Sequence, residues 1–380
     1  MKAASSLRGV TPVSHVPFAD LSHQWNPIAT EAMAELRQLF SDSAFSLGPW
    51  VERFEQSVAG YLGTPHAIGV NSGTSALHLA LIAAGIGPGD EVLLPSHTFI
   101  ATAWAVLYVG ATPVLCDVEE GSGTIDVADA ERRLSAATKA IVPVHLYGQP
   151  ADMAAVESLA QRHGLTVIED AAQAIGATYD GRRAGTLGKF GCFSFYPAKN
   201  LGAAGEAGLV VTSDGAAAAR MRALRHHAQS ERYVHAELGF NYRMEGVQGL
   251  VLDHKLRLLP DWIEERKGLA NAYAERLSHL PLALPRVAHK DHVFHLYVVR
   301  TPKRDALRAF LQERGIETGL HYPVPLHRQP CFSALDLDRD SFPVSDRYAS
   351  ECLSLPLFTG MDKAQLDYVC DGVLAYYGKS

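Results

Sequence analysis

The feature that most constrains this fold is a regular alternation of strand-like and helix-like segments between residues 66 and 170. Short apolar runs such as "HAIGV", "EVLLPS" and "LTVIED" predict strands, and segments such as "SGTSALHLALIAAG" and "DMAAVESLAQRHG" predict helices. The strands are continuously apolar, which is typical of a parallel sheet covered on both faces. The sequence therefore predicts a doubly wound α/β domain with a mostly parallel sheet flanked by helices.

The rest of the chain predicts a second, smaller unit. Within the alternating region we expect "KAIVPVHLYG" to be a strand throughout, and beyond it "GCFSFYP" and "GLVVTS" to form two more. A long helical stretch at 244–280 is broken near Pro260, and a mixture of strand and helix patterns follows it. Because 380 residues exceed what one core usually serves, we expect a large α/β domain at 1–250, including an N-terminal arm of about 1–30. Residues 251–380 would then form a connector helix and a small α+β domain.

Composition excludes several classes of protein. The net charge of -7 and the pI near 6.2 predict neither nucleic acid nor an anionic membrane as partner. Five scattered cysteines without a CxxC pair predict reduced thiols rather than a disulfide framework. No uninterrupted apolar run of about 18 residues occurs, and the first twenty residues lack the apolar core of a signal peptide. We therefore expect no membrane span and a cytoplasmic location.

The segment "NSGTSAL" follows a predicted strand and opens a predicted helix. Gly73, Thr74 and Ser75 would present backbone N–H groups and hydroxyls at the positive end of the helix dipole, and that combination binds phosphate. A helix start capped by Ser72 or Thr74, with no ligand, explains the same residues.

A lysine and an acid lie at positions that suit a cofactor. Asp170 ends the strand "LTVIED", where an anion could hold a proton on a heteroaromatic nitrogen or simply cap the next helix. Lys199 lies in "FSFYPAKNLGAAGEAGLVV", between two apolar runs, where burial would lower the pKa of its amine; the alternative is a solvated turn lysine. We expect the glycines after it to let a cofactor approach the backbone. A lysine, an acid and a phosphate cup are the three groups that pyridoxal phosphate requires, so the set predicts that cofactor.

Other site patterns are missing from the sequence. It contains no HExxH or Cys/His spacing of a zinc site and no GxSxG elbow, so we expect no metal. It also lacks GxGxxG, which counts against a dinucleotide oxidoreductase despite the α/β pattern.

The chain resembles the DegT/DnrJ/EryC1/StrS aminotransferases almost from end to end. The resemblance is carried by "LGPWVERFEQSVAGYLG", "NSGTSALHLAL", "VIEDAAQAIG", "FSFYPAKN", "GFNYRMEGVQ" and "GIETGLHYPVPLH". It implies a fold type I enzyme that depends on pyridoxal phosphate and transfers amino groups to sugars.

The resemblance also implies roles for individual residues. Lys199 is similar to the Schiff-base lysine, and Asp170 to the partner of the pyridinium nitrogen. Gln173 would face the phenolic oxygen of the cofactor, and Phe99 would stack on its ring. The implied phosphate ligands are Gly73, Thr74 and Ser194.

Two further groups of residues are implied to lie at the substrate and at a subunit interface. Asn241 is similar to an asparagine that reaches the phosphate of the neighbouring subunit's cofactor, which implies a homodimer with a shared active site. The implied contacts to the sugar or its diphosphate are Arg243, His321, Tyr322 and His327. A rigid proline-bounded loop with histidines facing water explains "HYPVPLH" equally.

We expect L-glutamate as amino donor and a nucleotide-linked keto-sugar as acceptor. In the family, a glutamine at the Gln173 position is more typical of enzymes that act at C-3, and histidine of those that act at C-4. The expectation is therefore a 3-keto-hexose, with a C-4 keto-sugar or a keto-cyclitol as alternatives. A non-catalytic sensor that binds pyridoxal phosphate also stays open.

Overall fold

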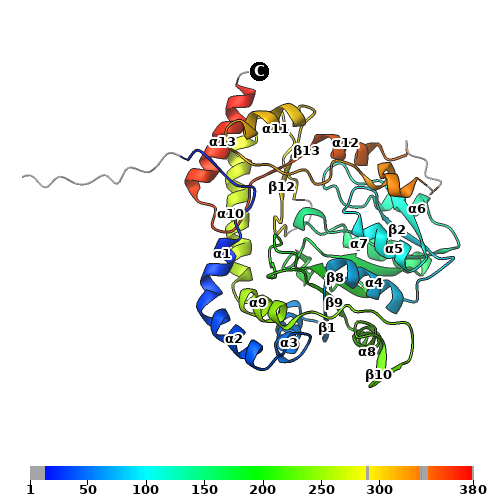
Figure 1. Ribbon diagram of the computed structural model, residues 1–380. Coiled ribbons are helices and arrows are strands. Elements are labelled where there is room, and N and C mark those ends of the chain that lie inside the picture. The colour runs from blue at the N-terminus through cyan, green and yellow to red at the C-terminus, as the bar shows by residue number, and fades with distance from the viewer. Residues whose placement is uncertain (1–12, 288–290, 334, 336–340, 379–380) are drawn as a thin grey trace, which may run out of the picture.

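A computed structural model describes residues 13–287, 291–333, 335 and 341–378, with a seven-stranded sheet at the centre of the larger unit (Figure 1). The strand order is β1-β9-β8-β5-β4-β2-β3. The bounds are β1 (His66–Val70), β2 (Glu91–Pro95), β3 (Thr112–Cys116), β4 (Thr138–Ile141), β5 (Thr166–Asp170), β8 (Phe190–Ser194) and β9 (Gly208–Thr212). In this sheet only β9 runs antiparallel to its neighbours, β1 and β8. The predicted mostly parallel sheet is confirmed.

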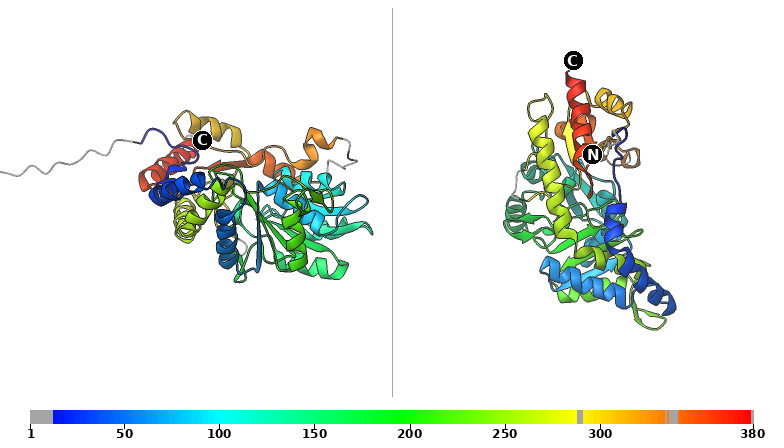
Figure 2. Two further views of the ribbon diagram at one scale, coloured as in Figure 1. Left: turned by 60° about the horizontal axis from the view of Figure 1, so that its bottom comes forward. Right: turned by 90° about the vertical axis from the view of Figure 1, so that its left-hand side faces the viewer.

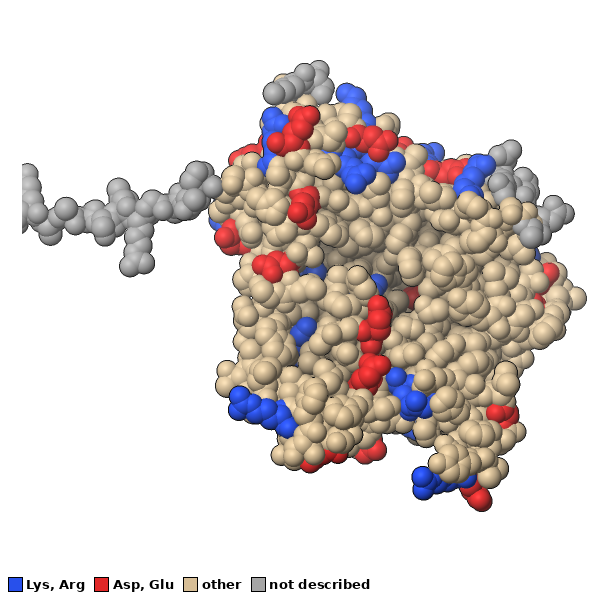
Figure 3. Space-filling view, viewed as in Figure 1, with Lys and Arg blue, Asp and Glu red and all other residues tan. Residues whose placement is uncertain are grey.

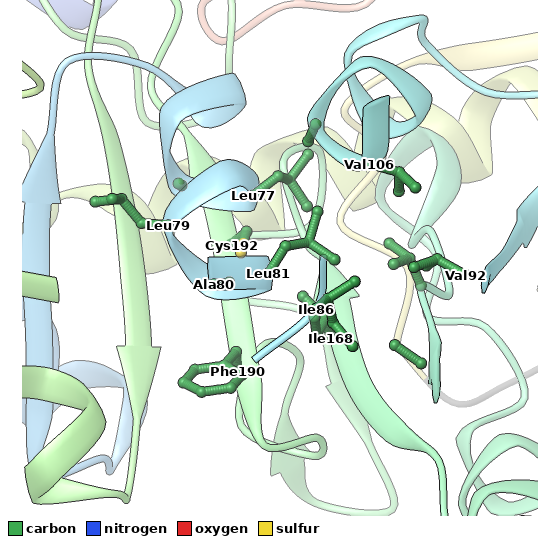
Figure 4. Close-up of a cluster of buried hydrophobic side chains, with 14 of the residues drawn as sticks. Leu77, Leu79, Ala80, Leu81, Ile86, Val92, Val106, Ile168, Phe190 and Cys192 are labelled. Atoms are coloured by element: carbon green, nitrogen blue, oxygen red, sulfur yellow. The ribbon is translucent and has the colours of Figure 1, made fainter. Parts of the chain in front are cut away.

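Helices cover both faces of the sheet, as the continuously apolar strands predict. One face carries α4 (Gly73–Ala83), α5 (Ala101–Tyr108) and α8 (Gly215–Leu224). The other carries α3 (Pro49–Leu62), α6 (Val127–Arg132) and α7 (Met153–His163). Figure 4 shows Leu77 and Leu81 of α4 directed toward the strands that carry Ile168 and Phe190. This packing fixes the start of α4 above the carboxyl ends of the central strands.

The strand predicted over "KAIVPVHLYG" is shorter than expected. β4 ends at Ile141, and only an isolated bridge between Val144 and Asp170 continues the pairing. Pro143 has no N–H to donate to the sheet, and Leu146–Gly148 turn away as a 3-10 helix, η2. The prediction of strand through residue 148 was therefore wrong. The turn brings Tyr147 beside Gln173.

The long helical stretch is broken where proline predicts it. It forms α9 (Gly246–Leu256) and α10 (Leu259–Leu277), with Pro260 in the first turn of α10. Beyond α10 lie β12 (Tyr297–Arg300), α11 (Arg304–Gln312), α12 (Pro343–Glu351), β13 (Cys352–Leu355) and α13 (Lys363–Tyr377). β12 and β13 form an antiparallel pair that packs in its own core with α10, α11 and α13.

Shorter elements complete the fold. They are α1 (Ser22–Trp25), η1 (Asn26–Ile28), α2 (Ala29–Ser41), β6 (Thr178–Tyr179), β7 (Arg182–Arg183), β10 (Gln229–Glu231), β11 (Val234–His235), η3 (Leu326–Arg328) and η4 (Pro330–Phe332). None of the helices in the described ranges is long and apolar enough to cross a membrane.

The separate core around α10 agrees with the expected division into two domains, although the boundary near residue 250 stays a prediction. The predicted arm is placed only in part, since residues 1–12 lie outside the described ranges. Its described portion begins on the C-terminal unit, where Val16 pairs with Ile316, and continues onto the larger unit, where Ile28 packs with Trp50. Figure 2 shows this N-terminal segment lying beside the C-terminal helix.

Candidate active site

A cavity of about 620 Å³ lies between the carboxyl ends of the central strands and the C-terminal unit. Figure 3 shows a hollow near the centre of one face, with acidic side chains at its edge. Nine of the residues predicted from the sequence line the cavity: Gly73, Thr74, Phe99, Asp170, Gln173, Ser194, Lys199, His321 and Tyr322.

One end of the cavity is formed by the start of α4. Ser72 caps the helix, and its Oγ accepts a hydrogen bond of 3.1 Å from the Ser75 N–H. The first turn of α4 is therefore both a capped helix start and part of the cavity lining. Gly73 is needed here because an added Cβ would lie 2.8 Å from Cβ of Ser194. The helix start and the end of β8 therefore converge on one point, as a phosphate requires.

Asp170 presents a buried carboxylate to the cavity from the end of β5. Its side chain is 5% exposed, and Thr102 donates a hydrogen bond of 2.8 Å to its Oδ2. Burial raises the pKa of Asp170, and the hydrogen bonds from Thr102 and the Ala172 N–H oppose that rise. A cationic N–H group in the cavity would compensate this buried charge.

Lys199 enters the same cavity from the loop between β8 and β9. Burial lowers the pKa of its amine to about 8, and the nearby Asp170 acts in the opposite direction. About a tenth of the amine is then neutral at pH 7, against well under a thousandth for an ordinary lysine. The lowered pKa is in the direction that a reactive amine requires, and the role of Lys199 stays a prediction.

Contacts that the sequence did not predict hold the backbone of the loop that carries Lys199. Gln24 Nε2 donates to the carbonyl oxygens of Lys199 and Asn200, each at 3.3 Å. Lys255 Nζ, from α9, donates to the Gly202 carbonyl at 2.7 Å. A lysine within the largely apolar helix "GVQGLVLDHKL" was the available signal for this support.

The glycines after Lys199 do not leave room for a ligand, contrary to expectation. A Cβ on Gly202 would lie 2.1 Å from the Pro197 carbonyl oxygen, and one on Gly208 would lie 2.3 Å from the Ser72 carbonyl carbon. Neither glycine lines the cavity. They allow the chain to pack against itself, and Gly208 brings β9 against the turn that opens α4.

Gln173 is fixed by two hydrogen bonds. Its Oε1 accepts from the Tyr147 N–H at 2.5 Å, and its Nε2 donates to the Tyr322 hydroxyl at 2.9 Å. The ring of Tyr322 lies 5.6 Å from that of Phe99, which is half exposed to the cavity. His321 is partly buried beside them, and loss of solvation lowers its pKa to about 4. The roles predicted for these side chains stay predictions.

His327 lies away from the cavity, and the prediction that it contacts substrate finds no support in its contacts. Its side chain has no exposed surface. Its Nδ1 pairs with Ser96 Oγ at 2.6 Å, and its Nε2 pairs with Asp346 at 3.0 Å. The ring also stacks on Phe342, so this histidine serves packing.

Arg243 and Asn241 also lie outside the cavity lining. Arg243 donates to Ser46 and contacts His226, each at 3.0 Å. Asn241 is exposed, and its carbonyl accepts a hydrogen bond from Asn71. The roles predicted for Asn241 and Arg243 stay predictions.

Comparison with known proteins identifies the family. The DegT/DnrJ/EryC1/StrS aminotransferase family matches residues 26–374. The chain belongs to this family. A Streptomyces venezuelae relative, dTDP-3-amino-3,4,6-trideoxy-alpha-D-glucose transaminase, is 44% identical over 370 residues, which is 97% of each chain. A Geobacillus stearothermophilus pleiotropic regulatory protein is 43% identical over 96% of this chain and 99% of its own. The solved structure of DesV from S. venezuelae superposes with a TM-score of 0.93 at 44% identity, covering 97% of this chain and 99% of that one.

Pyridoxal phosphate is the cofactor, as it is in solved members of the family, and the enzyme is an aminotransferase. The cavity fits this group on its own chemistry, because it combines a phosphate cup, a buried anion and a low-pKa lysine. Among the described residues, no cluster of three His, Cys, Asp or Glu side chains is arranged to hold a metal.

Proposed function

We propose that this protein transfers the amino group of L-glutamate to C-3 of a nucleotide-linked keto-hexose. The observation that carries the proposal is the convergence of Lys199, Asp170 and the Gly73 turn on one cavity. Two relatives support amination at C-3, since one is a dTDP-3-amino-3,4,6-trideoxy-alpha-D-glucose transaminase and the other a UDP-N-acetyl-3-dehydro-alpha-D-glucosamine 3-aminotransferase.

Bound pyridoxal phosphate supplies a conjugated ring that accepts the electron pair left when a proton leaves the carbon beside the amine. The residues of the chain do the remaining work. Lys199 holds the cofactor between turnovers, and its freed amine removes the proton from the donor Cα and returns one to the cofactor carbon. Asp170 keeps the ring nitrogen protonated, and the Gly73–Thr74 turn with Ser194 anchors the phosphate. The same groups then serve the keto-sugar in reverse order.

Regiochemistry is the finer part of the proposal, and it rests on Gln173. Because both ends of its amide are hydrogen-bonded, Gln173 keeps a fixed orientation at the cavity wall. In the family, a glutamine at this position is more typical of enzymes that act at C-3, and histidine of those that act at C-4.

A panel of nucleotide amino-sugars tests the acceptor. In the reverse half-reaction, only the true product should convert the lysine-linked cofactor to its amine form, which is seen as loss of the visible absorbance band. A 3-amino-hexose nucleotide is expected to react fastest. Faster reaction of a 4-amino sugar or an amino-cyclitol would overturn the C-3 assignment in favour of the alternative.

A regulatory role is the second candidate, because a relative with 43% identity carries the name pleiotropic regulatory protein. A sensor would bind the cofactor and yet form no 2-oxoglutarate from glutamate with any acceptor of the panel. Formation of 2-oxoglutarate in proportion to amino-sugar excludes a purely non-catalytic role.

We also propose a homodimer in which Asn241 completes the partner's phosphate site. The support is the position of Asn241 outside its own cavity and a set of exposed apolar side chains. These side chains are Phe99, Trp104, Leu107, Tyr108, Tyr196, Tyr233, Val234 and Leu238. They belong to α5, to the turns that carry Phe99 and Tyr196, and to the chain around β11, and a subunit interface over these elements would remove their apolar surface from water.

A further inference from the structure

The cavity contains a buried arginine that neither the sequence nor the proposed chemistry uses. Arg266 projects from α10, is 4% exposed and lines the same cavity as Lys199. Its Nη1 donates to the Leu357 carbonyl at 2.8 Å, whereas its Nε has no hydrogen-bond partner. Within the described residues no ion pair neutralises it. Because Nε has almost no accessible surface, the Nη2 edge of this guanidinium, for which the described residues provide no hydrogen bond or ion pair, is the part left for a ligand.

The surroundings make that edge a recognition element. Leu355, Leu357 and Leu296 line the cavity wall with Arg266 and exclude water from it. A buried, unpaired guanidinium is strongly unfavourable unless a ligand satisfies it. Burial lowers the pKa of Arg266 to about 10, so the group is still a cation at neutral pH.

His295 supplies a second unsatisfied group at this end of the cavity. It is 8% exposed, and its Nδ1 has no hydrogen-bond partner. Burial pushes its pKa well below the usual value, and the positive charges of Lys199 and Arg266 act in the same direction. The ring is therefore neutral, with one N–H to donate and one nitrogen to accept.

We propose that Arg266 and His295 form the subsite that takes a carboxylate of the amino donor. The inference rests on the proposed glutamate donor. A carboxylate matches the free Nη2 donor of this guanidinium, because a carboxylate and a guanidinium form a short, charge-assisted hydrogen bond. The cofactor phosphate has its own cup at the start of α4, and the acceptor's diphosphate must extend with its nucleoside toward the cavity mouth. The donor is the remaining anion, and its amine must reach the position that Lys199 vacates.

Rapid mixing of the cofactor-loaded protein with glutamate tests the subsite through the concentration that half-saturates loss of the visible band. Arg266→Gln should raise this concentration by roughly one to two orders of magnitude, because a hydrogen bond to a charged group is lost. Arg266→Lys should recover part of the loss. Arg276→Gln is the matched control, since Arg276 lies on the same helix and pairs with Asp367 and Asp371 on the other side.

Competing ligands identify which carboxylate is bound. Alanine keeps the α-carboxylate of glutamate and lacks the side-chain one, whereas 4-aminobutyrate keeps only the side-chain one. Each is added as a competitor in the glutamate half-reaction. If the α-carboxylate is bound, Arg266→Gln weakens competition by alanine and leaves that by 4-aminobutyrate unchanged. If the side-chain carboxylate is bound, the reverse holds.

The unmodified protein gives an independent test if the variants do not fold. Glutarate has carboxylates but no amine, so it should compete with glutamate while leaving the visible band intact. Lack of competition, or a half-saturating concentration in Arg266→Gln within twofold of the unmodified protein, would overturn the subsite. A failure of the unmodified protein to react with glutamate would instead overturn the proposed donor, so the two failures are distinct.

Discussion

At the scale of the residue, the account depends on a difference between two lysines whose pKa is lowered. Burial lowers the pKa of both Lys199 and Lys255 to about 8. Lys255 directs its Nζ at the Gly202 carbonyl oxygen, at 2.7 Å, and only Lys199 lines the cavity with Asp170. The lowered pKa is therefore common to both lysines. The position of Lys199 in the cavity is what assigns it as the reactive amine.

The rate of cofactor attachment should follow the titration of Lys199. Because the neutral amine attacks the aldehyde and the pKa is lowered from 10.5 to about 8, the rate should rise with pH up to about 8 and then level off. Absorbance after addition of pyridoxal phosphate to the cofactor-free protein measures it. A rate that keeps rising tenfold per pH unit beyond pH 9 would contradict the shift.

Replacing Asp170 should separate cofactor binding from turnover. Asp170→Asn keeps the shape but cannot hold a proton on the ring nitrogen, so turnover should fall about 100-fold or more while the visible band persists. Thr102→Val removes only the hydrogen bond to Asp170 and should lower turnover about tenfold or less. Steady-state rates with glutamate compare the two. Equal losses would show that the carboxylate is not the working group.

Residue types and strand ends in the sequence were sufficient to place Lys199, Asp170, Gly73 and Thr74 in one site. They could not place Arg266, because a single arginine in an ordinary amphipathic helix gives no signal of burial. The prediction that His327 contacts substrate found no support for a related reason, since a motif position does not reveal which way a ring points.

At the scale of the element, the sheet positions the site through close packing of β9 on the start of α4. The alternation of strands and helices predicted the parallel strands, whereas the antiparallel insertion of β9 between β1 and β8 depends on long-range pairing that local pattern does not encode. The end of β4 was missed because the apolar run continues past Pro143, whereas the structure has only an isolated bridge between Val144 and Asp170 there.

Two glycine substitutions should have opposite effects on stability. Gly208→Ala would place a methyl group 2.3 Å from the Ser72 carbonyl carbon and should destabilise the fold by about 1–3 kcal/mol. Gly268→Ala, inside α10, meets nothing within 4 Å and should stabilise by about 0.5–1 kcal/mol. Urea unfolding of the cofactor-free proteins measures both. If Gly208→Ala unfolds like the unmodified protein, the close packing at the phosphate turn is not as described.

At the scale of the whole molecule, the site is expected to be complete only in a dimer. Lys199 lines the cavity of its own chain, and Asn241 lies outside it. If Asn241 serves the partner, two inactive variants can compensate for each other.

Co-expression of Lys199→Ala and Asn241→Ala chains tests this arrangement. In a random mixture half of the dimers contain one chain of each kind, and one of their two sites is intact, so about a quarter of full activity should return. Purified homodimers of each variant serve as controls. Activity no greater than the sum of the two homodimers would show that each chain forms its site alone.

Chemical trapping tests the central assignment most directly. Borohydride reduction of the cofactor-loaded protein makes the link to lysine permanent, and peptide mass mapping then identifies the residue that carries the pyridoxyl group. The account predicts modification at Lys199 alone. Modification at Lys255, the other lysine with a lowered pKa, would contradict it. Modification of any further lysine with Lys199 left free would contradict it as well.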